Sequence, residues 1–407
     1  MRRVQGQIPI IICVILFFIF YPSLLFANGS YKKKLDSSLK SLVSNGSVLV
    51  ANDKKIIYRF SSNKNLKLIP ASVIKIMTAL AALHYLGLDF QFSTDFYLGN
   101  NDTLLIRGRG DPFLVSETWR IIAKKLKNLK GLPRKFNNIS FDNSLFSKKI
   151  KIPGVEFSSN PYDASNGALV VNFNTVFLEV GSNGRIFSAE KQTPLTPLAL
   201  RLGKKLMIGK HRIKIPDGSE ILYAGELVKE IFGQEGISFN SSKVNFQTIK
   251  SEDVFLYTHF NVNSIKNIIS GMMLYSNNFI ANQLLLSIGL KRYGAPATLF
   301  KGNQALKEYL VKKLKIPLDQ FDVEEGSGIS RKNRLTSEVV LSLLRAFSDK
   351  KYLLNNHKGV YLKTGTLRGV YSMAGYLEEN LYFVILLNQK KNNRDKILDL
   401  LLSIDSF

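Results

Sequence analysis

The two ends of this chain predict similar elements and its middle predicts different ones, and this contrast constrains the fold more than any single motif. Near the N-terminus, apolar spacing predicts a helix over residues 31–44, a hairpin over 47–60 and an apolar helix from Ser72 to about Tyr85. The C-terminal end predicts strands at 359–363, 370–377 and 381–387 and an amphipathic helix at 395–404. Helices and strands at both ends indicate one mixed α/β (α+β) domain that both termini complete.

The middle of the chain has many short β-like runs and few long helical patterns, with clusters of turn residues between them. We interpret it as a β-rich insertion into the first domain. The predicted domains are therefore residues 28–90 together with 262–407, and the inserted residues 91–261.

The N-terminus has the parts of a secretory signal, namely two arginines after the first Met, an apolar run over residues 8–26 and the small residue Ala27. We predict a signal peptide over residues 1–27 and an exported protein, periplasmic or otherwise extracytoplasmic. The alternative is a retained anchor, which two prolines in the run make less favourable. The only cysteine, Cys13, lies inside this segment, so the processed chain cannot form a disulfide or use cysteine chemistry.

The formal net charge of +25 predicts polyanionic partners. An exported chain meets little nucleic acid, so we expect no nucleic-acid binding, and anionic wall polymers or membrane surfaces are the expected contacts. The lysine pairs are scattered rather than gathered in one block, which favours a solvated surface for most of them.

Three short motifs carry the candidate chemistry, and the first is Ser72-Val73-Ile74-Lys75. Positions i and i+3 share a helix face, so the Lys75 amine can reach the Ser72 hydroxyl. Other Ser-x-x-Lys sequences occur, but only Ser72 begins a long apolar helix, where free N–H groups favour a developing anion. Burial and the positive charge of Lys363 would lower the pKa of Lys75 and let it act as a base.

The second motif, Ser276-Asn277-Asn278, lies between two apolar runs. Its polar side chains would therefore be held beside a core, where an unpartnered polar group is costly. Taken alone, a helix cap is the more ordinary interpretation of these residues.

The third motif is Lys363-Thr364-Gly365-Thr366, the only Lys-Thr-Gly in the chain, and it follows a strand-like run. A lysine on a strand edge supplies positive charge, and Gly365 allows a close approach of another backbone.

Ser-x-x-Lys, Ser-x-Asn and Lys-Thr-Gly, in this order, are the motifs of penicillin-binding proteins and serine β-lactamases. The chain resembles the class C penicillin-binding proteins, the D-alanyl-D-alanine carboxypeptidase/endopeptidase family. Its first two motifs lie 276 − 72 = 204 residues apart, which is similar to that family's large insertion. Further segments resemble the family, at residues 108–112, 141–146, 168–174 and 325–334.

The resemblance implies a β-lactamase/transpeptidase-like fold, with an antiparallel sheet flanked by helices and the insertion between the first and second motifs. It also implies an acyl-enzyme mechanism that needs no metal or cofactor. Ser72 would be the nucleophile, Lys75 its base and Ser276 a proton relay to the leaving amine.

The implied substrates are peptidoglycan stem peptides and cross-links, with β-lactams as acylating inhibitors. Asn278 would position the substrate amide, and the backbone N–H groups of Ser72 and Thr366 would hold the oxyanion. Lys363 and Thr364 would hold the terminal carboxylate.

The resemblance implies, in addition, a pocket for the diaminopimelate side chain of the stem peptide. By motif, Asp142, Arg331, Ile329 and Leu367 would line it. A carboxylate suits the ammonium of this zwitterionic side chain and an arginine suits its carboxylate.

Two other functions stay open at this point. A serine β-lactamase would need a dedicated deacylating base, and no glutamate can be assigned to that role. A catalytically inactive wall-binding scaffold would fit the basic charge, although all three motifs are intact. The motifs do not separate carboxypeptidase from endopeptidase activity, because both use the same acyl chemistry.

Overall fold

The computed structural model describes residues 32–62, 66–156, 158–357 and 359–404. The predicted signal peptide, residues 1–27, lies outside these ranges. Within them, no helix has both the length and the apolar composition needed to cross a lipid bilayer.

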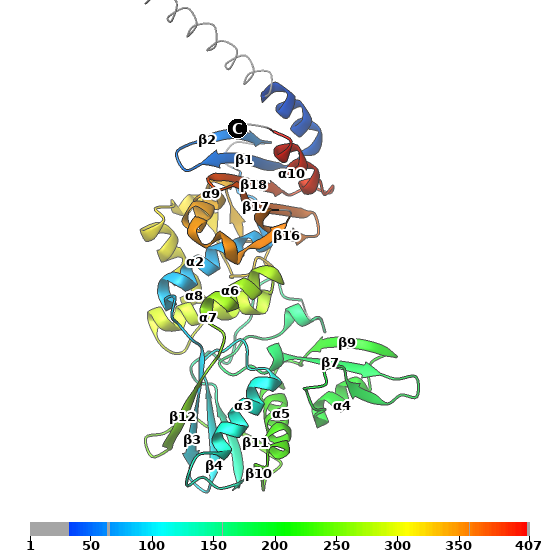
Figure 1. The fold of residues 1–407 in the computed structure, drawn as a ribbon, viewed down its shortest axis with the longest axis vertical. Helices are drawn as coiled ribbons and strands as arrows, with labels where there is room; N and C mark the ends of the chain where they lie inside the picture. The colour runs from blue at the N-terminus through cyan, green and yellow to red at the C-terminus, as the bar shows by residue number, and fades with distance from the viewer. Residues whose placement is uncertain (1–31, 63–65, 157, 358, 405–407) are drawn as a thin grey trace, which may run out of the picture.

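Strands from both ends of the chain form one antiparallel sheet of six strands, in the order β15-β16-β17-β18-β1-β2 (Figure 1). The strands are β1 (Gly46–Asn52), β2 (Ile56–Ser61), β15 (Asn355–His357), β16 (Val360–Leu367), β17 (Val370–Glu378) and β18 (Leu381–Leu387). The predicted N-terminal hairpin and C-terminal strands are therefore correct, and β1 and β18 bring the two ends together.

Helices cover both faces of this sheet because its side chains alternate between them. Val384 and Leu386 of β18 pack into the core formed with helices α2 and α9, whereas Phe383 and Ile385 pack against the first and last helices of the described chain. The helices are residues 32–42, α2 (Lys75–Leu86), α6 (Ile265–Leu274), α7 (Asn278–Tyr293), α8 (Leu299–Glu308), α9 (Ser337–Ala346) and α10 (Arg394–Leu402). The expected fold class, an antiparallel sheet flanked by helices, is confirmed.

The residues between the first two motifs form separate sheets. The larger one has five strands in the order β11-β6-β4-β3-β12. These are β3 (Ser93–Gly99), β4 (Thr103–Gly108), β6 (Asn138–Asp142), β11 (Val244–Phe246) and β12 (Val254–Phe260). Two amphipathic helices that the short β-like runs did not predict, α3 (Ser116–Lys127) and α5 (Glu220–Gln234), pack on it through buried side chains such as Trp119 and Phe232.

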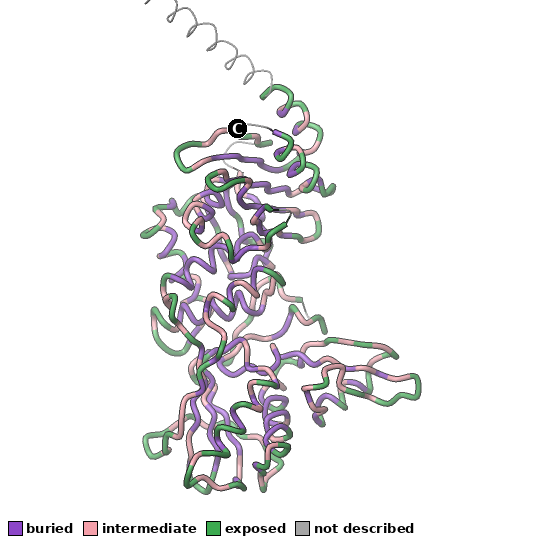
Figure 2. Tube along the Cα trace, viewed as in Figure 1, coloured by how far each residue is buried: buried purple, intermediate pink, exposed green. Residues whose placement is uncertain are grey.

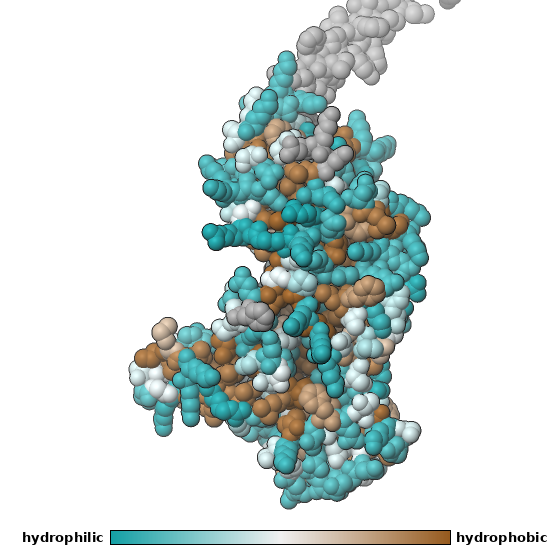
Figure 3. Space-filling model, turned by 180° about the vertical axis from the view of Figure 1, so that it is seen from behind, coloured by the Kyte–Doolittle hydropathy of each residue, from teal (hydrophilic) through white to brown (hydrophobic). Residues whose placement is uncertain are grey.

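A smaller three-stranded sheet, β8-β7-β9, projects from the body of the molecule, and we call it, together with α4, the arm (Figure 1). Its elements are β7 (Thr175–Val180), β8 (Ile186–Ser188), α4 (Pro197–Gly203) and β9 (Gly209–Lys214). Buried residues line the helices and sheets of the body, while exposed ones mark the free end of the arm (Figure 2). From behind, the surface is hollowed between the arm and the part that holds the six-stranded sheet (Figure 3).

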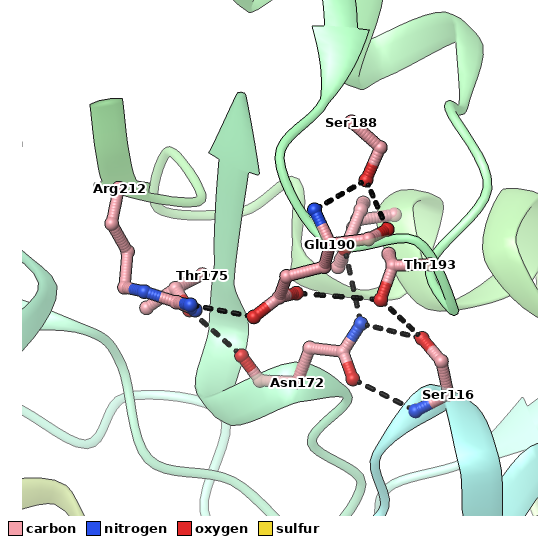
Figure 4. A network of polar contacts seen from close by, with 8 residues as sticks. Ser116, Asn172, Thr175, Ser188, Glu190, Thr193 and Arg212 are labelled. Atoms are coloured by element: carbon pink, nitrogen blue, oxygen red, sulfur yellow. Dashed lines mark hydrogen bonds and ion pairs between the residues drawn. The ribbon is translucent and has the colours of Figure 1, made fainter. Parts of the chain in front are cut away.

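A buried polar network fixes the base of the arm to α3 (Figure 4). The amide of Asn172 bonds both the backbone N–H of Ser116 and its hydroxyl, at 3.0 Å each. That hydroxyl lies 2.8 Å from the hydroxyl of Thr193. Because buried polar groups without partners are costly, this network holds the arm in a defined place.

Candidate active site

Ser72 lies on a short 3-10 turn, η1 (Ala71–Ile74), that leads directly into α2. Ala71 has a left-handed backbone, with φ of 45°, so the chain turns sharply before the serine. Strand β16 lies directly against this turn. A Cβ atom on Gly365 would stand 2.7 Å from the backbone nitrogen of Ser72 and 2.8 Å from the carbonyl oxygen of Pro70, so only glycine fits there.

Lys75 is fully buried and its amine touches three oxygens. Its Nζ lies 2.8 Å from Ser72 Oγ, 2.7 Å from Asn278 Oδ1 and 2.6 Å from the carbonyl oxygen of Ser327. The amide and carbonyl oxygens can only accept hydrogen bonds, whereas the Ser72 hydroxyl can also donate. A neutral amine has two hydrogens and one lone pair, so it can satisfy both acceptors and still accept the proton of Ser72.

The environment of Lys75 favours this neutral form. Burial, helped by the positive charge of Lys363, holds the pKa of Lys75 well below its usual value, and the carboxylate of Glu325 opposes this in part. The expectation that burial and Lys363 lower this pKa is confirmed. Ser72 and Lys75 are therefore in the hydrogen-bond contact that a serine nucleophile and its base would need.

The three residues of the second motif have different roles: one caps a helix and the other two contact the lysines of the first and third motifs. The middle residue, Asn277, is the N-cap of α7, since its Oδ1 accepts the N–H of Ile280 at 3.0 Å. Ser276 has a left-handed backbone, with φ of 51°, and its hydroxyl accepts a hydrogen bond from Lys363 at 3.0 Å. Asn278 accepts from Lys75. The capping interpretation thus applies to Asn277, while its two neighbours face the two lysines.

Lys363 of β16 is almost fully buried, and besides Ser276 it donates to the carbonyl oxygen of Thr364 at 2.9 Å. Burial, with a smaller contribution from Arg394, lowers the pKa of Lys363 to about 8. Strand β15 pairs with β16 only at residues 360–362, and no other described strand pairs with that edge at residues 363–367. This edge can accept an extended peptide as an added strand.

Arg394, at the start of α10, is a site residue that sequence reasoning missed. It donates to the hydroxyl of Thr366 at 2.8 Å and to the carbonyl oxygen of Gly365 at 3.2 Å. It therefore fixes the outer part of the third motif. Nothing in the local sequence marks it, because the contact depends on where α10 packs.

Glu325 is a second residue to which the sequence assigned no role. Its carboxylate is completely buried and accepts hydrogen bonds throughout the loop that follows it. The donors are Asn282 Nδ2, Ser327 N and Oγ, Gly328 N, Ser330 N and Asn333 Nδ2. This carboxylate thereby sets the position of the Ser327 carbonyl that contacts Lys75.

The four residues proposed for the side-chain pocket occupy different settings. A small pocket beside Asn278 includes Ile329, and its lining is Ile152, Val155, Tyr162, Ala164, Asn166, Asn278, Phe279, Asn282 and Ile329. Leu367 packs near Ile69, Ala71 and Val370. Arg331 donates to the carbonyl oxygen of Arg368 at 2.5 Å.

Asp142 lies at the end of β6, outside the lining of that pocket. It is the cross-strand partner of Arg107 in β4 and bonds its Nε at 3.0 Å. Its carboxylate also accepts the backbone N–H groups of Ser144 and Ile249, at 2.8 and 3.1 Å. Burial raises the pKa of Asp142, but these hydrogen bonds and the charge of Arg107 outweigh it and lower the pKa below its usual value.

The geometry thus joins the three motifs into one constellation of two lysines, two serines and an asparagine. Lys75 can take a proton from Ser72, and the Lys363 amine lies against the second serine, Ser276. Such an arrangement suits acyl transfer to a serine, with positive charge available for an anionic substrate group.

Comparison with known proteins agrees with this geometry. A curated relative, the D-alanyl-D-alanine carboxypeptidase DacB of Haemophilus influenzae, is 24% identical over 83% of each chain. The D-alanyl-D-alanine carboxypeptidase of Actinomadura sp. is 24% identical over 81% of this chain and 75% of its own. The crystal structure of penicillin binding protein 4 from H. influenzae superposes with a TM-score of 0.71 at 21% identity, covering 88% of this chain and 93% of that one.

A family comparison covers most of the described chain. The D-Ala-D-Ala carboxypeptidase 3 (S13) family matches residues 32–196 and 212–357, which include the first two motifs and most of the segment between them. The match agrees with the resemblance drawn from the three motifs. This chain therefore belongs to the D-Ala-D-Ala carboxypeptidase 3 (S13) family.

Proposed function

We propose that this protein is a serine D-alanyl-D-alanine carboxypeptidase that also acts as an endopeptidase on peptidoglycan cross-links, and that it works through an acyl-enzyme on Ser72. The observation that carries the proposal is the setting of Lys75. Its two acceptor-only partners, Asn278 and the Ser327 carbonyl, leave its lone pair for the Ser72 proton.

In the first half of the reaction, Lys75 takes the hydroxyl proton as Ser72 Oγ bonds to the carbonyl carbon between the two D-alanines. The backbone N–H groups of Ser72 and Thr366 hold the oxyanion. As the C–N bond breaks, a proton passes through Ser276 to the leaving amine. Water then attacks the ester, and its proton returns through the same groups, which restores the Ser72 hydroxyl.

Three parts of the site hold the substrate during these steps. Lys363 and Thr364 hold the terminal carboxylate of the peptide, and the buried Lys363 amine interacts with it more strongly than it could in water. Asn278 orients the substrate amide. The free edge of β16 at residues 363–367 takes the peptide backbone.

The relatives support β-lactam acylation and both peptidase activities. Penicillin binding protein 4 of H. influenzae has been solved with a β-lactam, and a Bdellovibrio bacteriovorus structure with a TM-score of 0.53 is a predatory endopeptidase. For substrate choice, the proposed diaminopimelate pocket involves Asp142, Arg331, Ile329 and Leu367. The place of Ile329 in the pocket beside Asn278 supports it. The carboxylate of Asp142 already bonds Arg107 within the protein, so its proposed contact with the substrate needs a separate test.

The proposal includes export and domain organisation. Cleavage after residue 27 would deliver the protein to the periplasm, where the net charge of +25 favours contact with anionic wall or membrane surfaces. Residues 28–90 and 262–407 would be the catalytic domain and residues 91–261 the insertion. The shared six-stranded sheet and the separate core of the insertion support this division.

The test is an intact-mass time course of residues 28–407 with benzylpenicillin. Every described helix and strand lies within residues 32–402, so this chain keeps the described fold. We expect a slowly released adduct on the unchanged protein and on Ser348→Ala, which removes the serine of another Ser-x-x-Lys. Ser72→Ala should give no adduct.

The other outcomes separate the alternatives. Rapid penicillin hydrolysis without a lasting adduct would indicate a β-lactamase. Neither adduct nor hydrolysis from folded protein would leave the wall-binding scaffold as the better description.

A further inference from the structure

The free end of the arm is built from two loops that are distant in sequence. Strands β7 and β9 are antiparallel, and their register pairs Val180 with Gly209. The turn at residues 181–185 and the loop at residues 204–208 therefore meet at the same end. We call these two loops, together with Phe187 of β8, the arm tip.

The arm tip exposes large apolar side chains that the fold does not use. Met207 is 80% exposed, Ile208 68% and Phe187 48%, although Met207 and Phe187 directly follow Leu206 and Ile186, which pack inward. Hydrophobic side chains gather along the arm between hydrophilic ones (Figure 3).

The loop that carries Met207 and Ile208 is held in place. A Cβ atom on Gly203 would stand 2.7 Å from the side chain of Ile186, so the end of α4 packs tightly on β8. The carbonyl oxygen of Met207 lies 2.8 Å from His211 Nε2 of β9. The apolar side chains are thus presented outward from a fixed loop.

The charge around these side chains is positive. Residues 179–211 contain six Lys or Arg and two Glu, a balance of 6 − 2 = +4. Both acidic residues are engaged, Glu179 with Lys210 at 3.7 Å and Glu190 with Arg212 at 2.5 Å. No carboxylate of the described chain forms an ion pair with the exposed Arg185, Lys204 or Lys205 at the arm tip.

We propose that the arm tip docks on a bilayer surface rich in anionic phospholipid. Apolar side chains that enter the headgroup region, ringed by cations that pair with lipid phosphates, are the two features that such a surface recognises. A purely polyanionic polymer would use the cations but leave Met207 and Ile208 without a role. This site is independent of the proposed peptidase activity, since the arm tip contains none of the three motifs.

The test is co-sedimentation of residues 28–407 with vesicles of phosphatidylcholine alone or mixed equally with phosphatidylglycerol. We expect binding only to the mixed vesicles. Lys204→Glu/Lys205→Glu should weaken it roughly twentyfold or more, because each cation near an anionic surface contributes about fivefold. Met207→Asp/Ile208→Asp should weaken it to a similar extent. The matched control is Val254→Asp/Phe255→Asp on β12, where the side chains are 59% and 55% exposed, and it should bind like the unchanged protein.

Three results would overturn the proposal. The unchanged protein could fail to bind mixed vesicles, the Met207→Asp/Ile208→Asp variant could bind as well as the unchanged protein, or the β12 control could lose as much binding as that variant. Loss only in the lysine variant would indicate adsorption to any polyanion. Penicillin acylation of every variant, measured in parallel, shows that it is folded. Because acylation reports on Ser72 alone, failure of docking and failure of the peptidase proposal are distinguishable.

Discussion

The Lys75 amine lies 2.7 Å from the side-chain oxygen of Asn278, so the first motif is hydrogen-bonded to a residue 203 positions further along the chain. The side chain of Asn278 carries no charge. The pKa of Lys75 is therefore governed by burial and by the charges of Lys363 and Glu325. An added charge at position 278 would change that balance.

Asn278→Asp should slow acylation at neutral pH. A carboxylate in contact with Lys75 favours the charged ammonium and raises its pKa by about 1–3 units, so less neutral base is present. The acid limb of the acylation rate, measured with a fluorescent penicillin, should move to higher pH by that amount. The control is Asn277→Asp, because aspartate also caps a helix and this side chain does not contact Lys75. An unchanged acid limb in Asn278→Asp would contradict the role of Lys75 as base.

The activity of the unchanged protein should pass through a maximum with pH. It should rise as Lys75 loses its proton and fall above about pH 8, because Lys363, with a pKa of about 8, then loses the charge that we propose binds the substrate carboxylate. The measurement is kcat/KM for a peptide ending in D-Ala-D-Ala between pH 5 and 10, a range chosen around that value. Lys363→Arg should remove the alkaline fall, since guanidinium stays charged. A rate that keeps rising through pH 10 would refute the assignment.

Glu325→Gln should destabilise the fold and also lower the pKa of Lys75. The carboxylate accepts hydrogen bonds from several N–H and O–H groups. The NH2 group of a glutamine cannot accept them, so some of these buried donors would lose their partner, which should lower the free energy of unfolding by about 2–4 kcal/mol. Because Glu325 raises the pKa of Lys75, its loss should move the acid limb of acylation to lower pH. The neighbouring Glu324→Gln, whose side chain is 30% exposed, should cost less than about 1 kcal/mol in urea unfolding. Equal stability of the two variants would show that Glu325 does not hold the loop at residues 326–333 in place.

Asp142→Asn tests the diaminopimelate pocket. If Asp142 recognises the side chain, kcat/KM should fall about tenfold or more on diaminopimelate-bearing peptides and stay unchanged on simple D-Ala-D-Ala peptides. If it only braces β6 against Arg107, both substrates should be affected equally and the melting temperature should fall. The control Arg107→Gln breaks the same ion pair and should reproduce the loss of stability without the substrate preference.

Local patterns in the sequence predicted the elements that carry the first and third motifs, but not helix α7, which carries Asn278 of the second. The apolar run after Pro70 and the spacing of Ser72 and Lys75 follow from helix periodicity, and the C-terminal strands follow from alternation and turn residues. The order of the three motifs indicated the family, and the family implied the sheet flanked by helices. The helices α3 and α5 were missed, because short β-like runs on either side of them obscured their periodicity.

Contacts between distant segments were decided only by the tertiary structure. Whether Asn277 or its neighbours cap α7 depends on where that helix begins, and Arg394 reaches Thr366 only because α10 packs on β17 and β18 of the same sheet. Arg107 becomes the partner of Asp142 through strand register, which the local sequence does not encode. The sequence by itself determined which residues could do the chemistry, because residue type and spacing are local properties. The structure decided the direction of their pKa shifts and their partners, because burial and contact depend on the whole fold.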